Sequence, residues 1–296
     1  MKIKGNTGVN IKTVGIFSLV VYVILFAIRL YQTFSITDGV TGYFTQNNFT
    51  VMLMYILVIG SVVAVCALCY ISSVLPKGEL NKKFSGIYVV GGVLFAASLL
   101  YDAFKNINVI RTMGSIAEAK ESIGGTLGLV ATVFALFGAV VIIVEAVACV
   151  KGKGISEKLS IPLLFPVIWA FCETLSFFSI TVSYIKVSQL LFTIFFVAFL
   201  MVFLFENARV CSGIGRKNAM WFFYASGIVT VGLSLAGAVP VLIATFAAPE
   251  KIVSYCTFEP YALGGGIYAL ASMLARTGKK DDVMDSTTEN QEISEI

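Results

Sequence analysis

Two charged residues lie inside long apolar segments of the sequence, where ionisable side chains are costly. Glu173 lies close to the middle of the apolar run 161 to 183, and Arg29 lies near the end of the run 14 to 34. A charged side chain at the centre of a bilayer costs at least about 2.5 kcal/mol on insertion, so each group requires a partner, a cavity or a route to the headgroups. A long arginine can reach the interface, whereas glutamate cannot. Glu173 is therefore the most informative residue in the sequence.

These two residues are expected to form a buried ion pair if their helices are neighbours. A short sequence repeat suggests that Arg29 and Glu173 lie at similar depth in the membrane. The same four residues close both runs, as Phe34-Ser35-Ile36-Thr37 and Phe178-Ser179-Ile180-Thr181, and aligning them places Arg29 opposite Glu173. Each charge would offset part of the desolvation of the other. The pair has two readings: it binds a substrate or a proton, or it is a static clasp between two helices.

Three consecutive glycines form a second candidate feature. Gly264, Gly265 and Gly266 directly follow Glu259-Pro260-Tyr261 and the two residues after it, at the start of a short apolar run. Glycine removes side-chain bulk, so this segment is either interrupted, with backbone polar groups facing a cavity, or closely approached by another helix. Interrupted helices often mark binding sites in transporters. Glu173, Arg29 and the three glycines together form the candidate substrate-binding site.

The other ionisable residues of the apolar runs lie near run ends. Glu145 and Glu206 are expected to reach the interface or to pair with Lys151 or Arg209, and Asp102 is expected to be interfacial. None of these is a strong indication of a transport site.

Several kinds of chemistry have no basis in this sequence. It has no histidine, which is the commonest metal ligand and the usual titrating group near neutral pH. It has no phosphate-binding loop, zinc-protease motif, serine-nucleophile elbow or dinucleotide fingerprint. Cys66 and Cys69 form a C-x-x-C inside an apolar run, where they are best explained as small apolar side chains one turn apart. We expect no metal, no cofactor and no enzymatic activity.

The composition defines the elements that position these residues. The chain is 58% hydrophobic and 13% charged, which is typical of a membrane protein and leaves no stretch large enough for a soluble catalytic domain. The expected fold is an all-α polytopic transmembrane bundle of about eight spans. The apolar runs cover residues 14–34, 51–75, 86–104, 123–150, 161–183, 188–208, 219–247 and 261–275. Spans one to four and five to eight would share one orientation, which permits a 4+4 tandem repeat.

Basic residues between the runs predict the orientation in the membrane. If the N-terminus is inside, the inner segments hold 15 lysines and arginines and the outer segments hold 5, with Arg29 making up the total of 21. Cytoplasmic loops carry the excess of basic residues, so both termini are expected to be cytoplasmic. The bundle, residues 1 to 276, is expected to be followed by a disordered acidic cytoplasmic tail, residues 277 to 296. This tail is either a plain solvated end or the binding site of a cytoplasmic partner.

Parts of the fifth and sixth runs resemble other proteins. The segments Ile161-Pro162-Leu163-Leu164-Phe165-Pro166 through Trp169, and Phe205-Glu206-Asn207-Ala208-Arg209, resemble a pattern in uncharacterised multi-pass integral membrane proteins of bacteria. The resemblance implies a bacterial cytoplasmic membrane and no particular activity.

The sequence leaves two functional hypotheses. The first is a membrane protein that binds or transports a small molecule within its bundle at Glu173, Arg29 and the three glycines. The alternative is a non-enzymatic scaffold or sensor subunit whose buried charges are structural. The lipid bilayer is the expected surrounding in both, and nothing supports binding to nucleic acid.

Overall fold

The computed structural model describes residues 11–38, 44, 49–72, 81, 84–115, 122–150, 161–179, 188–212, 221–252 and 258–276. These residues are almost entirely helical, and within them no named strand is found. The long helices are α1 (Ile11–Tyr31), α2 (Phe49–Ser72), α3 (Ser85–Met113), α5 (Gly125–Val150), α6 (Phe165–Ser179), α7 (Ser188–Cys211), α8 (Trp221–Leu233), α9 (Val239–Ala247) and α10 (Pro260–Ala275). Short helical turns extend or join them: η1 (Gln32–Ile36), η4 (Pro162–Leu164), η6 (Ser234–Ala238) and η7 (Pro249–Lys251). The predicted tail, residues 277 to 296, and Lys151 lie outside the described residues.

Six of the helical segments are long and apolar enough to cross a membrane. This confirms the predicted all-helical fold with several membrane-spanning helices. They are Thr13–Ile36, Phe49–Ser72, Ser85–Met113, Gly125–Ala148, Gln189–Cys211 and Trp221–Ala247. The segment Pro162–Phe178 and helix α10 are apolar but shorter. Helix α3 continues beyond the predicted end at residue 104 and stops before Gly114, whose positive φ of 67° ends the helix without strain.

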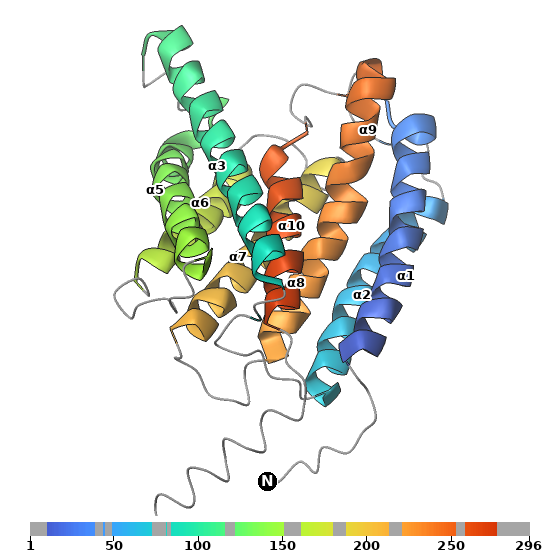
Figure 1. Cartoon of the computed structure of the whole chain (residues 1–296). Helices are drawn as coiled ribbons and strands as arrows, with labels where there is room; N and C mark the ends of the chain where they lie inside the picture. Colours follow the sequence, from blue (N-terminus) through green and yellow to red (C-terminus); the bar gives the residue numbers. More distant parts are fainter. Residues whose placement is uncertain are drawn as a thin grey trace, which may run out of the picture.

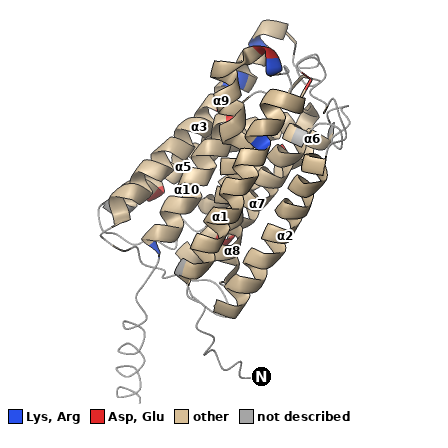
Figure 2. Cartoon of the chain, turned by 90° about the vertical axis from the view of Figure 1, so that its right-hand side faces the viewer, with Lys and Arg blue, Asp and Glu red and all other residues tan. Residues whose placement is uncertain are grey.

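The helices run up and down in a single bundle (Figure 1). Helix α1 begins and α10 ends at the same end of the bundle, which we call the lower end, as in Figure 1; α3 ends and α10 begins toward the opposite, upper end. Helix α10 is central, because it packs against α3, α7 and α8. Charged residues are few along the helices (Figure 2). The outer surface of the bundle is therefore mostly uncharged.

Large apolar side chains remain exposed on this outer surface. Ile16 on α1, Met52 on α2 and Phe137 on α5 are each more than half exposed. Water-soluble monomers rarely leave contiguous apolar surfaces of this extent uncovered. The exposed faces therefore suit contact with lipid acyl chains.

The glycine run lies within an uninterrupted helix, so the interrupted helix, one of the two readings of this run, is wrong. Gly264, Gly265 and Gly266 are all α-helical members of α10. The close approach predicted as the alternative is confirmed. A Cβ atom on Gly264 would lie 2.7 Å from Ser98 Oγ of α3, and one on Gly266 would lie 2.3 Å from Ser234 Oγ of η6. The three glycines thus let α10 pack closely against its neighbours.

The helical segment Trp221–Ala247 is irregular at its centre. Helix α8 passes into the π-helical turn η6, and Pro240 follows at the start of α9. Proline has no backbone N–H to donate to the preceding turn, so a regular α-helical ladder cannot pass through this position. The irregularity that precedes Pro240 is a π-turn inside the helix.

Candidate functional site

Glu173 lies on α6, where it belongs to a group of ionisable side chains at the upper end of the bundle. It is partly buried, and it interacts electrostatically with Asp102 and Lys105 of α3 and with Glu259 at the start of α10. The hydroxyl of Tyr261 on α10 lies close to it. We call Asp102, Glu173, Glu259 and Lys105 the upper acidic cluster. Three helices that are distant in sequence therefore bring these groups together.

One short ion pair joins two members of this cluster. Lys105 Nζ donates to Glu259 Oε1 at 2.7 Å, and the side chains of Lys105 and Glu259 are 41% and 19% exposed. Asp102, predicted to be interfacial, is instead only 4% exposed. It is buried because α3 turns this residue toward α6 and α10 rather than toward lipid. The cluster is thus buried on the side of Asp102 and open to the surroundings on the side of Lys105.

Several buried polar atoms of this region are unsatisfied among the described residues. Asp102 Oδ2, Trp169 Nε1 and Tyr261 Oη have no partner at hydrogen-bonding geometry. Trp169 and Tyr261 are at most 1% exposed, and their rings are 5.3 Å apart in an edge-to-face arrangement. Most buried polar atoms in proteins are hydrogen-bonded to protein or to ordered water. Trp169 Nε1 faces Asp102 and the Tyr261 hydroxyl faces Glu173, so these atoms lie near one another's acceptors without reaching good hydrogen-bond geometry.

Arg29 lies near the upper end of α1, in a separate group. Its Nη1 donates to Gln32 Oε1 at 3.3 Å and its Nη2 donates to Gln189 Oε1 at 2.8 Å. The guanidinium carbon lies 4.9 Å from the centre of the Phe192 ring on α7. The side chain is 2% exposed, so Arg29 does not extend to the headgroups but is held inside the bundle by amide oxygens and an aromatic face.

The structure does not bring Arg29 and Glu173 together as the predicted ion pair. Arg29 is absent from the groups that interact with Glu173. Their helices are not neighbours: α1 packs mainly against α2, α8 and η6, whereas α6 packs mainly against α5 and α7. The pairing prediction is wrong because it assumed that similar depth implied adjacency.

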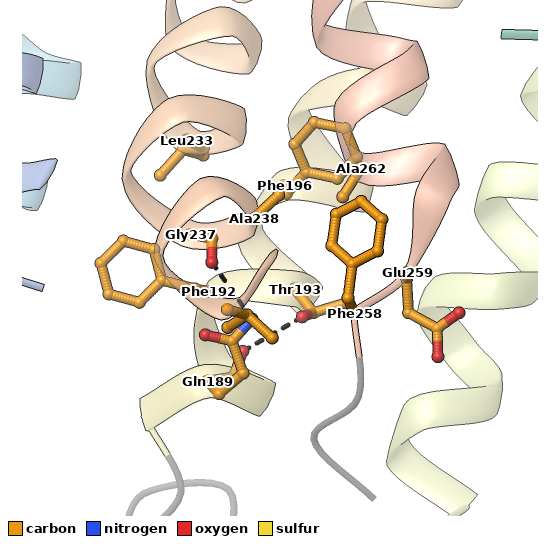
Figure 3. Close-up of a pocket in the computed structure, with 11 residues that line it drawn as sticks. Gln189, Phe192, Thr193, Phe196, Leu233, Gly237, Ala238, Phe258, Glu259 and Ala262 are labelled. Atoms are coloured by element: carbon orange, nitrogen blue, oxygen red, sulfur yellow. Dashed lines mark hydrogen bonds between the residues drawn. The ribbon is translucent and has the colours of Figure 1, made fainter. Parts of the chain in front are cut away.

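A small pocket lies between the two groups (Figure 3). Its walls come from α7, from the segment α8–η6–α9, and from the start of α10. Gln189, which holds Arg29, lines one side, and Glu259 of the upper acidic cluster lies at another edge with its carboxylate directed away from Gln189. Gln189 also donates to Gly237 O at 3.4 Å, across to the π-turn. Glu173 and the three glycines of α10 do not line this pocket.

The pocket is tight in this conformation. The space open to the centre of a water molecule is about 10 Å³, which is roughly what one water molecule requires. Much of the wall is aromatic or aliphatic, with Phe192, Phe196 and Phe258 prominent. A larger solute therefore requires movement of one wall.

A second polar network lies in the lower half of the bundle and was not predicted. The carboxylate of Glu145 on α5 accepts hydrogen bonds from Tyr88 of α3 and, at 3.1 Å, from Tyr268 of α10. Arg276 Nη2 lies 3.9 Å from Glu145 Oε1 and donates to Cys211 Sγ at 2.8 Å. Glu145 and Arg276 are each 1% exposed. This lower polar network joins α3, α5, α7 and the end of α10.

The expected roles of Glu145 and Arg276 need correction. Glu145 does not reach the interface, because Tyr88, Tyr268 and Arg276 hold it inside the bundle. Arg276, counted as a loop residue, is buried. Glu206 does pair with Arg209 as predicted, at 2.7 Å. The sequence does contain a signal for this network: Tyr88 and Tyr268 are polar residues within apolar runs, and they lie near the same end of the bundle as Glu145.

No cluster of three or more metal-ligating side chains is found among the residues that the structure describes. The upper acidic cluster, the Arg29 group and the pocket between them therefore form the candidate site. Comparison of the chain with protein-family models, curated proteins and solved structures finds no match.

Proposed function

We propose that this membrane protein binds a small solute at the upper end of its bundle and moves it across the membrane. The observation that supports the proposal is the pocket between Gln189, which holds Arg29, and Glu259, which belongs to the upper acidic cluster. Buried charges within a membrane bundle commonly line solute or proton pathways. Pockets with apolar walls and a few polar groups are the usual form of a small-molecule site.

The proposed topology has eight passes with both termini in the cytoplasm of a bacterial cell. Helices α6 and α10 complete the eight as short passes; α10 is largely buried, whereas α6 packs against α5 and α7 and exposes Phe171 and Phe178. The start of α1 and the end of α10 lie at the same end of the bundle, which supports termini on one side (Figure 1). The excess of basic residues on that side supports its cytoplasmic placement. The two halves then share one orientation, as a 4+4 repeat requires.

Chemical accessibility of the pocket tests this proposal. Ala262 lines the pocket, whereas Ala269 lies two turns further along α10 and is fully buried. We expect Ala262→Cys to react with a membrane-impermeant cationic methanethiosulfonate added outside intact cells, and Ala269→Cys to remain unmodified. Mass spectrometry of the α10 peptide measures the modification at each position.

Two controls make the result interpretable. Gly60→Cys, on an α2 position with no atom within 4 Å of its Cβ site, reports a lipid-facing cysteine. Both α10 variants must retain the thermal unfolding temperature of the unsubstituted protein. If Ala262→Cys stays unmodified from outside in a folded protein, the pocket does not communicate with the medium and the proposed function is wrong.

A scaffold or sensor subunit is the second candidate. The lower polar network favours it, because its buried charged pair is fully embedded and the pocket admits only about one water molecule. In that case the interior is closed and residues 277 to 296 bind a cytoplasmic partner. A scaffold is expected to lose a co-purifying protein when these residues are removed. In a scaffold, Ala262→Cys is also expected to be unreactive.

A further inference from the structure

We propose that the solute is a small organic cation with a primary ammonium group, which binds at the upper acidic cluster by replacing the ammonium of Lys105. This inference rests on the proposed function and names the chemical class of its solute. Three observations support it: the composition of the cluster, its unsatisfied acceptor atoms and the position of Lys105.

The composition of the cluster favours a positive ligand. Glu173 interacts with two further carboxyl groups, Asp102 and Glu259, and with a single ammonium group, that of Lys105. Carboxyl groups placed together at low dielectric repel one another unless a cation or a proton lies between them. An added ammonium group would relieve this repulsion, whereas an anion would increase it.

The unsatisfied atoms match the donors of an ammonium group. Asp102 Oδ2 and Tyr261 Oη make no well-formed hydrogen bond in the described residues, although Trp169 faces the first and Glu173 the second, and both side chains are at least nine-tenths buried. The hydroxyl of Tyr261 is directed toward Glu173, so these acceptors belong to the same site. An ammonium group has three hydrogen-bond donors and no acceptor, and can therefore satisfy such a set.

The aromatic residues at the site favour an organic cation. The rings of Trp169 and Tyr261 are 5.3 Å apart, and Phe95 lies 6.0 Å from Trp169. Aromatic faces attract ammonium groups and also bury an attached hydrocarbon chain. A bare divalent metal ion lacks such a chain, and no metal-holding group of side chains is found in the described part of the chain.

Lys105 already presents a primary ammonium to the cluster. Its Nζ lies 2.7 Å from Glu259 Oε1, at the end of a long side chain that is 41% exposed. A partly exposed ion pair of this kind contributes little and is readily exchanged. Lys105 can therefore leave Glu259 when an external ammonium arrives.

The positive charge of Arg29 does not favour an anionic ligand over a cationic one. Two of its nitrogens already donate to Gln32 and Gln189. The side chain of Gln189, rather than that of Arg29, lines the pocket. A zwitterion that uses both groups is nevertheless a distinct outcome of the experiment.

Fluorescence of Trp169 provides a direct test. The chain has two tryptophans, so Trp221→Phe leaves Trp169 as the only indole, next to Asp102 and Tyr261. The purified full-length variant is titrated with propylammonium, β-alanine or propionate, which have three carbons and differ in charge, at constant ionic strength. We expect a saturable change in emission with propylammonium alone.

Two substitutions connect the signal to the cluster. Asp102→Asn keeps the shape of the side chain and should weaken propylammonium binding by at least about tenfold, as loss of one partner of a buried charge contact does. Lys105→Met removes the competing ammonium and should tighten binding about twofold to fivefold, the range expected for a partly exposed ion pair. Thermal unfolding in detergent verifies that each variant is folded.

The outcomes separate this inference from the function on which it rests. Saturation by propylammonium with both expected shifts supports the inference. Tighter binding of β-alanine or propionate, or no response to propylammonium while Ala262→Cys is reactive from outside, overturns the cationic assignment and leaves the proposed function standing. An Ala262→Cys variant that does not react removes the proposed function itself.

Discussion

Arg276→Gln is expected to destabilise the protein by at least about 3 kcal/mol, the loss that follows when one partner of a buried ion pair is removed. Glu145 would then remain in the bundle, 1% exposed, without the guanidinium 3.9 Å away. The thiol of Cys211 would also lose its 2.8 Å contact with Arg276. Thermal and denaturant unfolding of the purified protein in detergent measures the change.

Arg209→Gln is the matched control for this prediction. Arg209 also contacts a glutamate, Glu206 Oε1, at 2.7 Å, but its side chain is 27% exposed. Arg209 reaches solvent although Glu206 is only 8% exposed, so we expect a smaller loss than that of Arg276→Gln. The double substitution Glu145→Leu with Arg276→Met should recover much of the loss, because it removes both buried charges together. Equal effects of Arg276→Gln and Arg209→Gln would contradict the assigned role of the lower polar network.

Gly266→Ala is expected to cost about 1 to 3 kcal/mol, the usual penalty for overpacking a well-packed core. The added Cβ would lie 2.3 Å from Ser234 Oγ and 2.5 Å from Ser234 Cβ, so α10 and η6 would have to separate. The expected result is a lower unfolding temperature with an unchanged helical content by circular dichroism.

Two further variants isolate the steric cause. Gly60→Ala adds the same methyl group on α2, where no atom lies within 4 Å, and should leave stability unchanged or raise it. Adding Ser234→Gly to Gly266→Ala removes the opposing side chain and should restore part of the lost stability. If Gly60→Ala were as harmful as Gly266→Ala, close packing at η6 would not explain the effect.

The sequence predicted the helices well, because each apolar run is long enough for lipid to determine its secondary structure. All eight runs are helical in the structure, with ends that differ by a few residues except in α3. Even the short last run, which becomes α10, forms a helix, since its glycines are held in place by α3, α7 and η6.

The partners of the buried charges could not be predicted, because the runs are apolar on every side and do not reveal which face meets which helix. The groups around Glu173 are the Tyr261 hydroxyl, the Lys105 ammonium and two further carboxyl groups, rather than Arg29. Glu145 was assigned to the interface from its position near a run end, whereas α3 and α10 enclose it. Apolar runs in a sequence do not show the order of helices around a bundle.

The π-turn at Ser234–Ala238 has a mechanical consequence for the pocket. Each residue of an α-helix turns the chain by about 100° and advances it by about 1.5 Å, and a π-turn contains one residue more than an α-turn. Moving this extra residue along the segment would rotate only the residues that it passes, and the pocket-lining Gly237 and Ala238 are among those in the turn. Such a shift would change the shape of the pocket wall while the helix on either side kept its hydrogen bonds.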